Sequence, residues 1–114
     1  MLLGKIVGTV VSTHKDTGMT GFKLLVVQNL DLQMKLTNSY VIAIDAVGAG
    51  MDEVVIVVQG SSARLTDQTK NKPVDAAIIC IVDSIESGGK QIYEKTRDSA
   101  PVHRIEMVHT SEAV

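Results

Sequence analysis

The feature that most constrains this fold is a run of five β-branched residues, 54–58, with a glycine-containing segment on each side. A short apolar run between turn signals is typical of a strand that is buried on both faces. Residues 47–50 (Val-Gly-Ala-Gly) precede it, and glycine there permits backbone angles that other residues avoid. Residues 60–64 (Gly-Ser-Ser-Ala-Arg) follow it, with a serine placed to cap a short helix near residues 62–66. We therefore expect a turn, a central strand and a short helix, in this order.

Four further segments are rich in β-branched and apolar residues, and turn residues separate them: 3–13, 22–30, 40–46 and 76–85. Residues 31–39 have the composition of a polar connection, and residues 67–73 that of an exposed loop. Five short strands with little helix favour an all-β fold, a small closed or nearly closed OB-like barrel of five strands. Closure also pairs the edges of such apolar strands, which otherwise promote aggregation.

The composition of the chain changes after residue 86. Residues 87–90 (Ser-Gly-Gly-Lys) have the composition of a flexible joint, and the remainder is mostly charged and polar. We therefore expect a barrel domain over residues 1–86 and a partly ordered C-terminal extension over residues 87–114. Within this extension, residues 102–108 are a candidate for a further strand or a docking segment, and residues 109–114 are expected to fray.

Charge and composition argue against several classes of protein. The formal net charge is −2 and aromatic residues make up 3% of the chain, so a nucleic-acid partner, which needs a basic groove and stacking platforms, is not expected. No apolar segment approaches the ~18 residues of a membrane-spanning helix, and the N-terminus lacks the pattern of a signal peptide. The single cysteine, Cys80, excludes an internal disulfide and a cysteine-based zinc site, and we expect it to be a small core residue. We therefore expect a cytoplasmic protein without a membrane partner.

The search for catalytic or metal-binding residues is negative. The histidines, His14, His103 and His109, lack the helical spacing with a glutamate that binds zinc. Neither a dinucleotide fingerprint nor a phosphate-binding loop follows a strand. Carboxylates near strand ends are expected to cap turns: Asp45, Asp52, Glu53, Asp75 and Asp83. We therefore expect no enzyme, no metal site and no cofactor.

Five stretches carry a resemblance to a known family. They are residues 3–13 (LGKIVGTVVST) with Lys15-Asp16, 21–28 (GFKLLVVQ), 45–50 (DAVGAG), 60–64 (GSSAR) and 74–83 (VDAAI through IVD). In this order and spacing they resemble the EutN/CcmL/PduN family, the pentameric vertex proteins of bacterial microcompartment shells, including carboxysomes and ethanolamine- and propanediol-type organelles. The resemblance covers about the first three quarters of the chain. Members of the family commonly carry glycine at the position of Asp52, and frequently at that of Cys80.

The resemblance implies a five-stranded barrel that assembles into a homo-pentamer and caps the vertices of a microcompartment shell in the cytoplasm. Hexameric shell proteins of the same microcompartment would form the facets. A ring of five uses a heterologous interface, one surface of each subunit against a different surface of the next. Such a structural protein needs no active site.

The candidate residues for the subunit interface or an axial pore are small except for Arg64, and they lie on both sides of the central strand. They are Gly48, Ala49 and Gly50, and then Gly60, Ser61, Ser62, Ala63 and Arg64. Arg64 is a candidate partner for a carboxylate or a backbone carbonyl of the adjacent subunit, since a guanidinium binds such acceptors well. The alternative function is a small-barrel binding module that takes an anion, a nucleotide or a peptide at residues 60–64.

Overall fold

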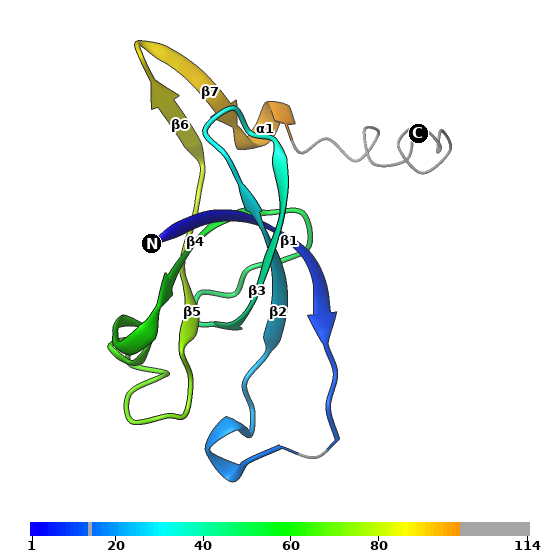
Figure 1. The fold of residues 1–114 in the computed structure, drawn as a ribbon, viewed down its shortest axis with the longest axis vertical. Coiled ribbons are helices and arrows are strands. Elements are labelled where there is room, and N and C mark those ends of the chain that lie inside the picture. Colours follow the sequence, from blue (N-terminus) through cyan, green and yellow to red (C-terminus); the bar gives the residue numbers. More distant parts are fainter. Residues whose placement is uncertain (14, 99–114) are drawn as a thin grey trace. The chain divides into compact units, whose positions relative to one another are not determined.

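The computed structural model describes residues 1–13 and 15–98, which fall into two compact units. The first unit is Met1–Val82, and the second begins at Asp83. Figure 1 shows the first unit as a set of curved strands joined by loops. Almost all regular structure in the described chain is β-strand, which confirms the predicted all-β class.

The first unit is a closed barrel of five strands in the order β1-β2-β3-β5-β4. The strands are β1 (Leu2–Val10), β2 (Leu24–Leu30), β3 (Leu36–Asp45), β4 (Val54–Gln59) and β5 (Ala76–Ile81). Neighbouring strands are antiparallel except β3 and β5, which are parallel and pair only through Ile44 with Ala77 and Asp45 with Ile78. Two 3-10 helices, η1 (Thr17–Met19) and η2 (Gly60–Arg64), lie in the connections. The structure therefore confirms the predicted five-stranded barrel.

Two apolar cores explain why the central strand is buried on both faces. Alternate residues of the strands fill the barrel interior, among them Ile6, Leu25, Val27, Val55 and Val57. A second core lies on the other face of the sheet and contains Ile44, Val58, Ala63, Val74 and Ala77. Because β4 contributes Val55 and Val57 to one core and Val58 to the other, the burial predicted for residues 54–58 is confirmed except at Ile56, which is half-buried.

Three strand boundaries differ from those expected by three or four residues, and the others by at most two. The third strand begins at Leu36 instead of residue 40, because the polar residues of the expected connection continue the pairing with β2 on an exposed hairpin. The Gln28 side chain donates to the Thr37 carbonyl at 2.7 Å, and the Thr37 hydroxyl donates to the Asn29 carbonyl at 3.0 Å, where the register shifts. The first strand ends at Val10 and the fifth at Ile81. Exposed polar strands lack the apolar alternation by which strands are recognised in a sequence.

The expected serine cap of the short helix is wrong. Helix η2 begins two residues earlier than predicted, and its N-cap residue is Gln59, which makes no side-chain capping hydrogen bond. Gly60, at φ +67°, makes the turn into this helix, and its N–H donates to the Asp75 carbonyl at 2.8 Å. The helix start is thus fixed by a glycine and a backbone bond to the segment before β5.

The second unit contains a hairpin of β6 (Ser84–Ser87) and β7 (Lys90–Glu94), followed by α1 (Lys95–Asp98). Gly88 and Gly89 both have positive φ and form the hairpin turn, so the expected flexible joint at residues 87–90 is wrong. The expected domains, 1–86 and 87–114, stay a prediction, since compactness does not show that either part folds alone. The candidate strand at residues 102–108, the tail at 109–114 and all three histidines lie outside the described residues.

Candidate subunit interface

The turn after β3 is fixed by one carboxylate. An Asp45 carboxylate oxygen accepts hydrogen bonds from the backbone N–H groups of Val47, Gly48 and Ala49 at 3.1, 3.0 and 3.1 Å. Gly48 has a φ of +78° and is exposed. The expectation that Asp45 caps a turn is confirmed. These three bonds fix the shape of the loop from within the chain.

The next residues anchor the same loop to the barrel. Ala49 is 1% exposed and lies in the barrel core, while its carbonyl accepts a hydrogen bond from the Lys23 Nζ atom at 3.3 Å. The Gly50 N–H donates to a Glu53 carboxylate oxygen at 2.6 Å. Asp52 has a φ of +68°, in the left-handed region that favours glycine. Of the first candidate segment, only Gly48 is therefore well exposed.

Helix η2 carries the second candidate segment. Ser61 and Ser62 are exposed, whereas Ala63 is completely buried in the second core. The Ala63 carbonyl accepts a hydrogen bond from the hydroxyl of the buried Thr69 at 2.6 Å. The Arg64 guanidinium donates to the Val74 carbonyl of its own chain at 3.1 Å. The two serines are thus presented outward from a helical turn that its neighbours hold in place.

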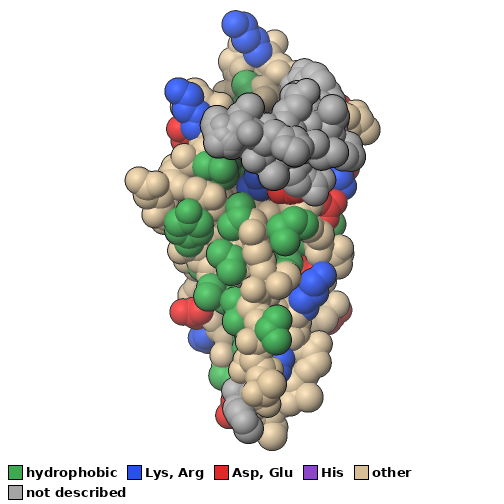
Figure 2. Space-filling model, turned by 90° about the vertical axis from the view of Figure 1, so that its right-hand side faces the viewer, with side chains coloured by type: hydrophobic (Ala, Val, Ile, Leu, Met, Phe, Trp, Pro, Cys, Tyr) green, Lys and Arg blue, Asp and Glu red, His purple; other side chains and the backbone are tan. Residues whose placement is uncertain are grey.

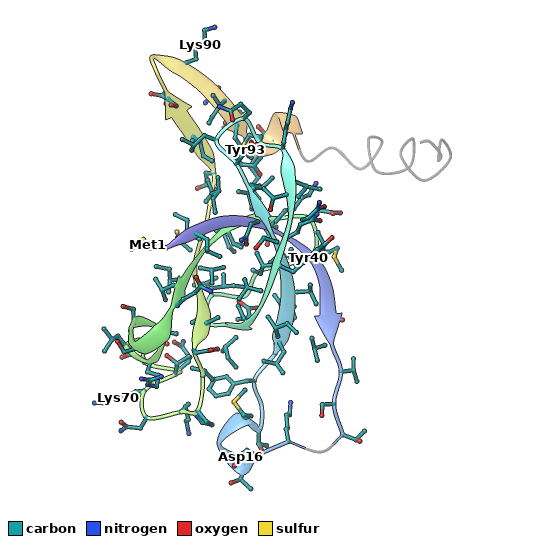
Figure 3. All side chains as sticks on the ribbon, viewed as in Figure 1. Met1, Asp16, Tyr40, Lys70, Lys90 and Tyr93 are labelled. Carbon is teal, nitrogen blue, oxygen red and sulfur yellow. The ribbon has the colours of Figure 1, made fainter. Side chains whose placement is uncertain are left out.

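An open hollow of about 560 Å³ adjoins Arg64. Lys72, Pro73, Val74 and Asp75 complete its lining, and Figure 3 labels Lys70 in the same loop between η2 and β5. Two cationic side chains line the hollow, and one of them, Arg64, already donates a hydrogen bond to a backbone carbonyl. The Asp75 carboxylate offsets part of their positive charge. The hollow is therefore a weak candidate for the alternative anion site.

The two candidate segments flank β4 in the sequence, with residues 51–53 between the first segment and the strand. The loop that carries the first segment leaves β3 after Ile44 and Asp45, and Ile44 shares the second core with Ala63 of η2. None of the hydrogen bonds described above joins residues 48–50 to residues 60–64. Their assignment to an interface or pore stays a prediction.

The sequence analysis missed an exposed apolar surface on the outside of β2 and β3. Tyr40 is 58% exposed and Ile42 52%, and Val26 lies directly across from Ile42. The hairpin beyond them exposes Leu32 and Leu36. Figure 2 shows hydrophobic side chains gathered across this side of the molecule, with charged side chains mainly around them. The apolar residues at 40, 42 and 44 were the available signal, but a sequence pattern does not say which face of a strand stays uncovered.

Searches for two other kinds of site give no candidates. Among residues 1–13 and 15–98, no group of three or more histidine, cysteine, aspartate or glutamate side chains is placed to hold a metal ion. No helix in the described part of the chain is long and apolar enough to cross a membrane. Cys80 is half-buried on β5, less enclosed than the expected core residue.

Residues 1–83 match the family described as "Ethanolamine utilisation protein EutN/carboxysome". The carboxysome shell vertex protein CcmL of Synechococcus elongatus is 42% identical over 99 residues, which cover 87% of this chain and 100% of that protein. The microcompartment shell vertex protein GrpN of Rhodospirillum rubrum is 46% identical over 87 residues, 76% of this chain and 98% of that protein.

Solved structures of such proteins share the fold. The structure of Gloeobacter violaceus CcmL superposes with a TM-score of 0.81 at 38% identity, covering 84% of this chain and 99% of that one. The GrpN structure, described as a pentameric microcompartment shell protein, superposes with a TM-score of 0.70 at 47% identity, covering 76% and 100%.

Proposed function

The chain belongs to the EutN/CcmL family, and from this premise we propose that it is a structural shell protein which forms a pentamer and caps the vertices of a bacterial microcompartment. The observation that carries the proposal is the similarity to GrpN, whose whole length this chain matches and whose structure is pentameric. This chain also matches the whole length of CcmL, a shell vertex protein, and this match supports the same proposal. The protein accordingly resides in a microcompartment shell in the cytoplasm.

The closed barrel suits a structural role. Its loops are held by bonds within the chain, such as those of Asp45 and Thr69, so the subunit has a defined shape before assembly. Assembly into a ring then loses little conformational entropy, which favours association. The role requires no chemistry, so the protein is not an enzyme and needs no cofactor.

The partners in the shell are hexameric shell proteins of the same microcompartment. A flat sheet of hexamers cannot close into a polyhedron without five-fold positions, and a pentamer fills such a position. The barrel is compact enough to act as a rigid corner piece, because its strands form a closed set without a break in the order β1-β2-β3-β5-β4.

Two segments are candidates for the contacts within the ring or around its axis. Gly48 and its neighbours present a rigid, exposed turn, and Ser61 and Ser62 present small polar side chains that suit a narrow polar opening.

The mass of the purified protein, measured by native mass spectrometry over a range of concentrations, tests the ring. We expect a five-subunit mass that persists on dilution. Co-expression with hexameric shell proteins then tests the vertex role, with closed shells expected only when this protein is present. A monomer at every concentration would contradict the proposal and would turn attention to binding of anions, nucleotides or peptides at residues 60–64.

A further inference from the structure

The outside of the barrel carries a row of apolar positions across three strands. Gly8 of β1 pairs with Val26 of β2, and Val26 pairs with Ile42 of β3. Paired residues of neighbouring strands place their side chains on the same face of a sheet. Leu25 and Ala43, the neighbours of Val26 and Ile42 along the strands, are buried in the barrel, so this row points outward. Tyr40 continues the row along β3, two residues from Ile42.

The chain covers only part of this outer face. One step toward the other end of the strands, Leu24 and Ile44 form a pair that the second core covers, with Phe22 and Ala63 packed nearby. Val26 and Ile42 come next, and there Ile42 is 52% exposed while Val26 is half-buried. The apolar face thus extends beyond the part that the barrel buries for itself.

One edge of β3 adjoins the same surface. Within the described residues, β3 pairs with β5 only at Ile44 and Asp45, and no other barrel strand pairs with this edge from Leu36 to Ala43. Natural proteins protect exposed strand edges with charge, proline or a covering element. Here the edge runs beside an apolar row of Gly8, Val26 and Ile42, in which no position is charged, and Lys5 lies at its margin, paired with Gln28.

A second apolar row lies on other strands of the barrel. Leu3 of β1 pairs with Ile56 of β4, and Ile56 pairs with Cys80 of β5. All three are half-buried, and the neighbours of Ile56, Val55 and Val57, point into the barrel, so this row also lies outside. It contains no charged residue either.

Resting on the proposed pentamer, we propose that the β2–β3 row (Val26, Tyr40 and Ile42, with Gly8) packs against the β4–β5 row (Leu3, Ile56 and Cys80) of the next copy of this chain. A ring requires two different surfaces on each subunit, which must fit each other. Interface cores are depleted of charge and enriched in tyrosine, which describes the β2–β3 row. A membrane or nucleic acid would instead require lysines or arginines among the exposed positions.

The first experiment places a charge in the β2–β3 row. Ile42→Asp buries a carboxylate in the proposed interface, and we expect the concentration at which the ring dissociates to rise roughly 30-fold or more. Leu65→Asp is the matched control, because Leu65 is 82% exposed and belongs to neither row, and this variant is expected to keep the wild-type mass. Circular dichroism checks that both variants stay folded, and Tyr40→Asp serves as an independent second variant.

The second experiment uses the one cysteine of the chain to test which surfaces meet. An Ile42→Cys variant, treated with a short bis-maleimide, should link the introduced thiol of one subunit to the native Cys80 of the next. A contact between different surfaces continues around the ring, so covalent species should extend to five subunits on a denaturing gel. A contact between identical surfaces would stop at covalent dimers, and this result would overturn the pairing of the two rows.

The outcomes separate this inference from the proposed function. A wild-type protein that is not pentameric contradicts the proposed function. A pentameric wild type whose Ile42→Asp and Tyr40→Asp variants remain folded and pentameric leaves the function standing and overturns the assigned interface. Loss of the ring in these two variants, with the ring kept in Leu65→Asp and cross-linking up to five subunits, establishes it.

Discussion

Gly4 of β1 and Val27 of β2 approach so closely that no side chain fits at residue 4. A Cβ atom built on Gly4 would overlap the Cγ1 atom of Val27 and would lie 3.1 Å from the Gln28 carbonyl oxygen. Gly4 is buried, and Val27 is completely buried in the barrel core. This glycine therefore lets two strands close around the core, and its role is close packing rather than an unusual backbone angle.

We predict that Gly4→Ala destabilises the barrel. Val27 cannot move aside without displacing other core residues, so the added methyl group should lower the free energy of unfolding by about 1–3 kcal/mol. Urea unfolding at one protein concentration measures the change. Gly8→Ala is the control in the same strand, since its Cβ would lie at an ordinary 3.7 Å from Val26. Because Gly8 belongs to the proposed β2–β3 row, native mass spectrometry checks that both variants keep the ring of the wild type. Equal stability of the two variants would contradict the argument.

The Asp45 carboxylate is predicted to stabilise the loop after β3. Asp45→Ala removes the acceptor of three backbone N–H groups and should lower the free energy of unfolding by about 1–3 kcal/mol. Asp45→Asn keeps an acceptor oxygen and should lose less. Thermal unfolding of the three proteins gives the ranking, and an alanine variant as stable as the wild type would show that solvent replaces these bonds without cost.

Thr69 is predicted to hold the loop between η2 and β5. It is completely buried, and its hydroxyl group bonds both the Ala63 carbonyl and the Thr66 hydroxyl at 2.6 Å. Thr69→Val keeps the shape but leaves the Ala63 carbonyl without this donor, so we expect a loss of about 1–3 kcal/mol and faster hydrogen exchange in residues 65–75. Thr69→Ser retains the hydroxyl group and serves as the control; its exchange in this loop should stay closer to that of the wild type.

Arg64 is predicted to contribute to the ring. The contact with the Val74 carbonyl uses one N–H group of a guanidinium that has five, and the sequence predicts an acceptor on the adjacent subunit for the other donors. Arg64→Ala should therefore dissociate at a higher protein concentration than the wild type, by roughly 5- to 10-fold if one charge-assisted bond is lost. Native mass spectrometry on dilution measures this. Lys72→Ala, in the same hollow, is the control. If the Arg64→Ala ring dissociates at the same protein concentration as the wild type, Arg64 does not contribute to the interface.

The sequence by itself determined the fold class and the family. Residues 54–58 and the four other apolar segments predicted five strands, and the barrel contains all five. Local composition suffices here because a buried strand requires β-branched apolar residues wherever it lies in the sheet. The resemblance in residues 1–83 likewise depends only on the order of residues along the chain, and the comparisons confirm it.

Only the tertiary structure decided which residues are accessible. Ala49 and Ala63 stand in glycine- and serine-containing segments that suggest a surface, yet each is buried in a core built from distant strands. Ile42 and Ile44 are the same residue type on the same face of β3, but η2 and its neighbours cover only Ile44. The exposure of a side chain depends on which remote segment packs above it, and the cross-strand register sets that packing. The sequence pattern of a single strand therefore does not reveal which of its residues are exposed.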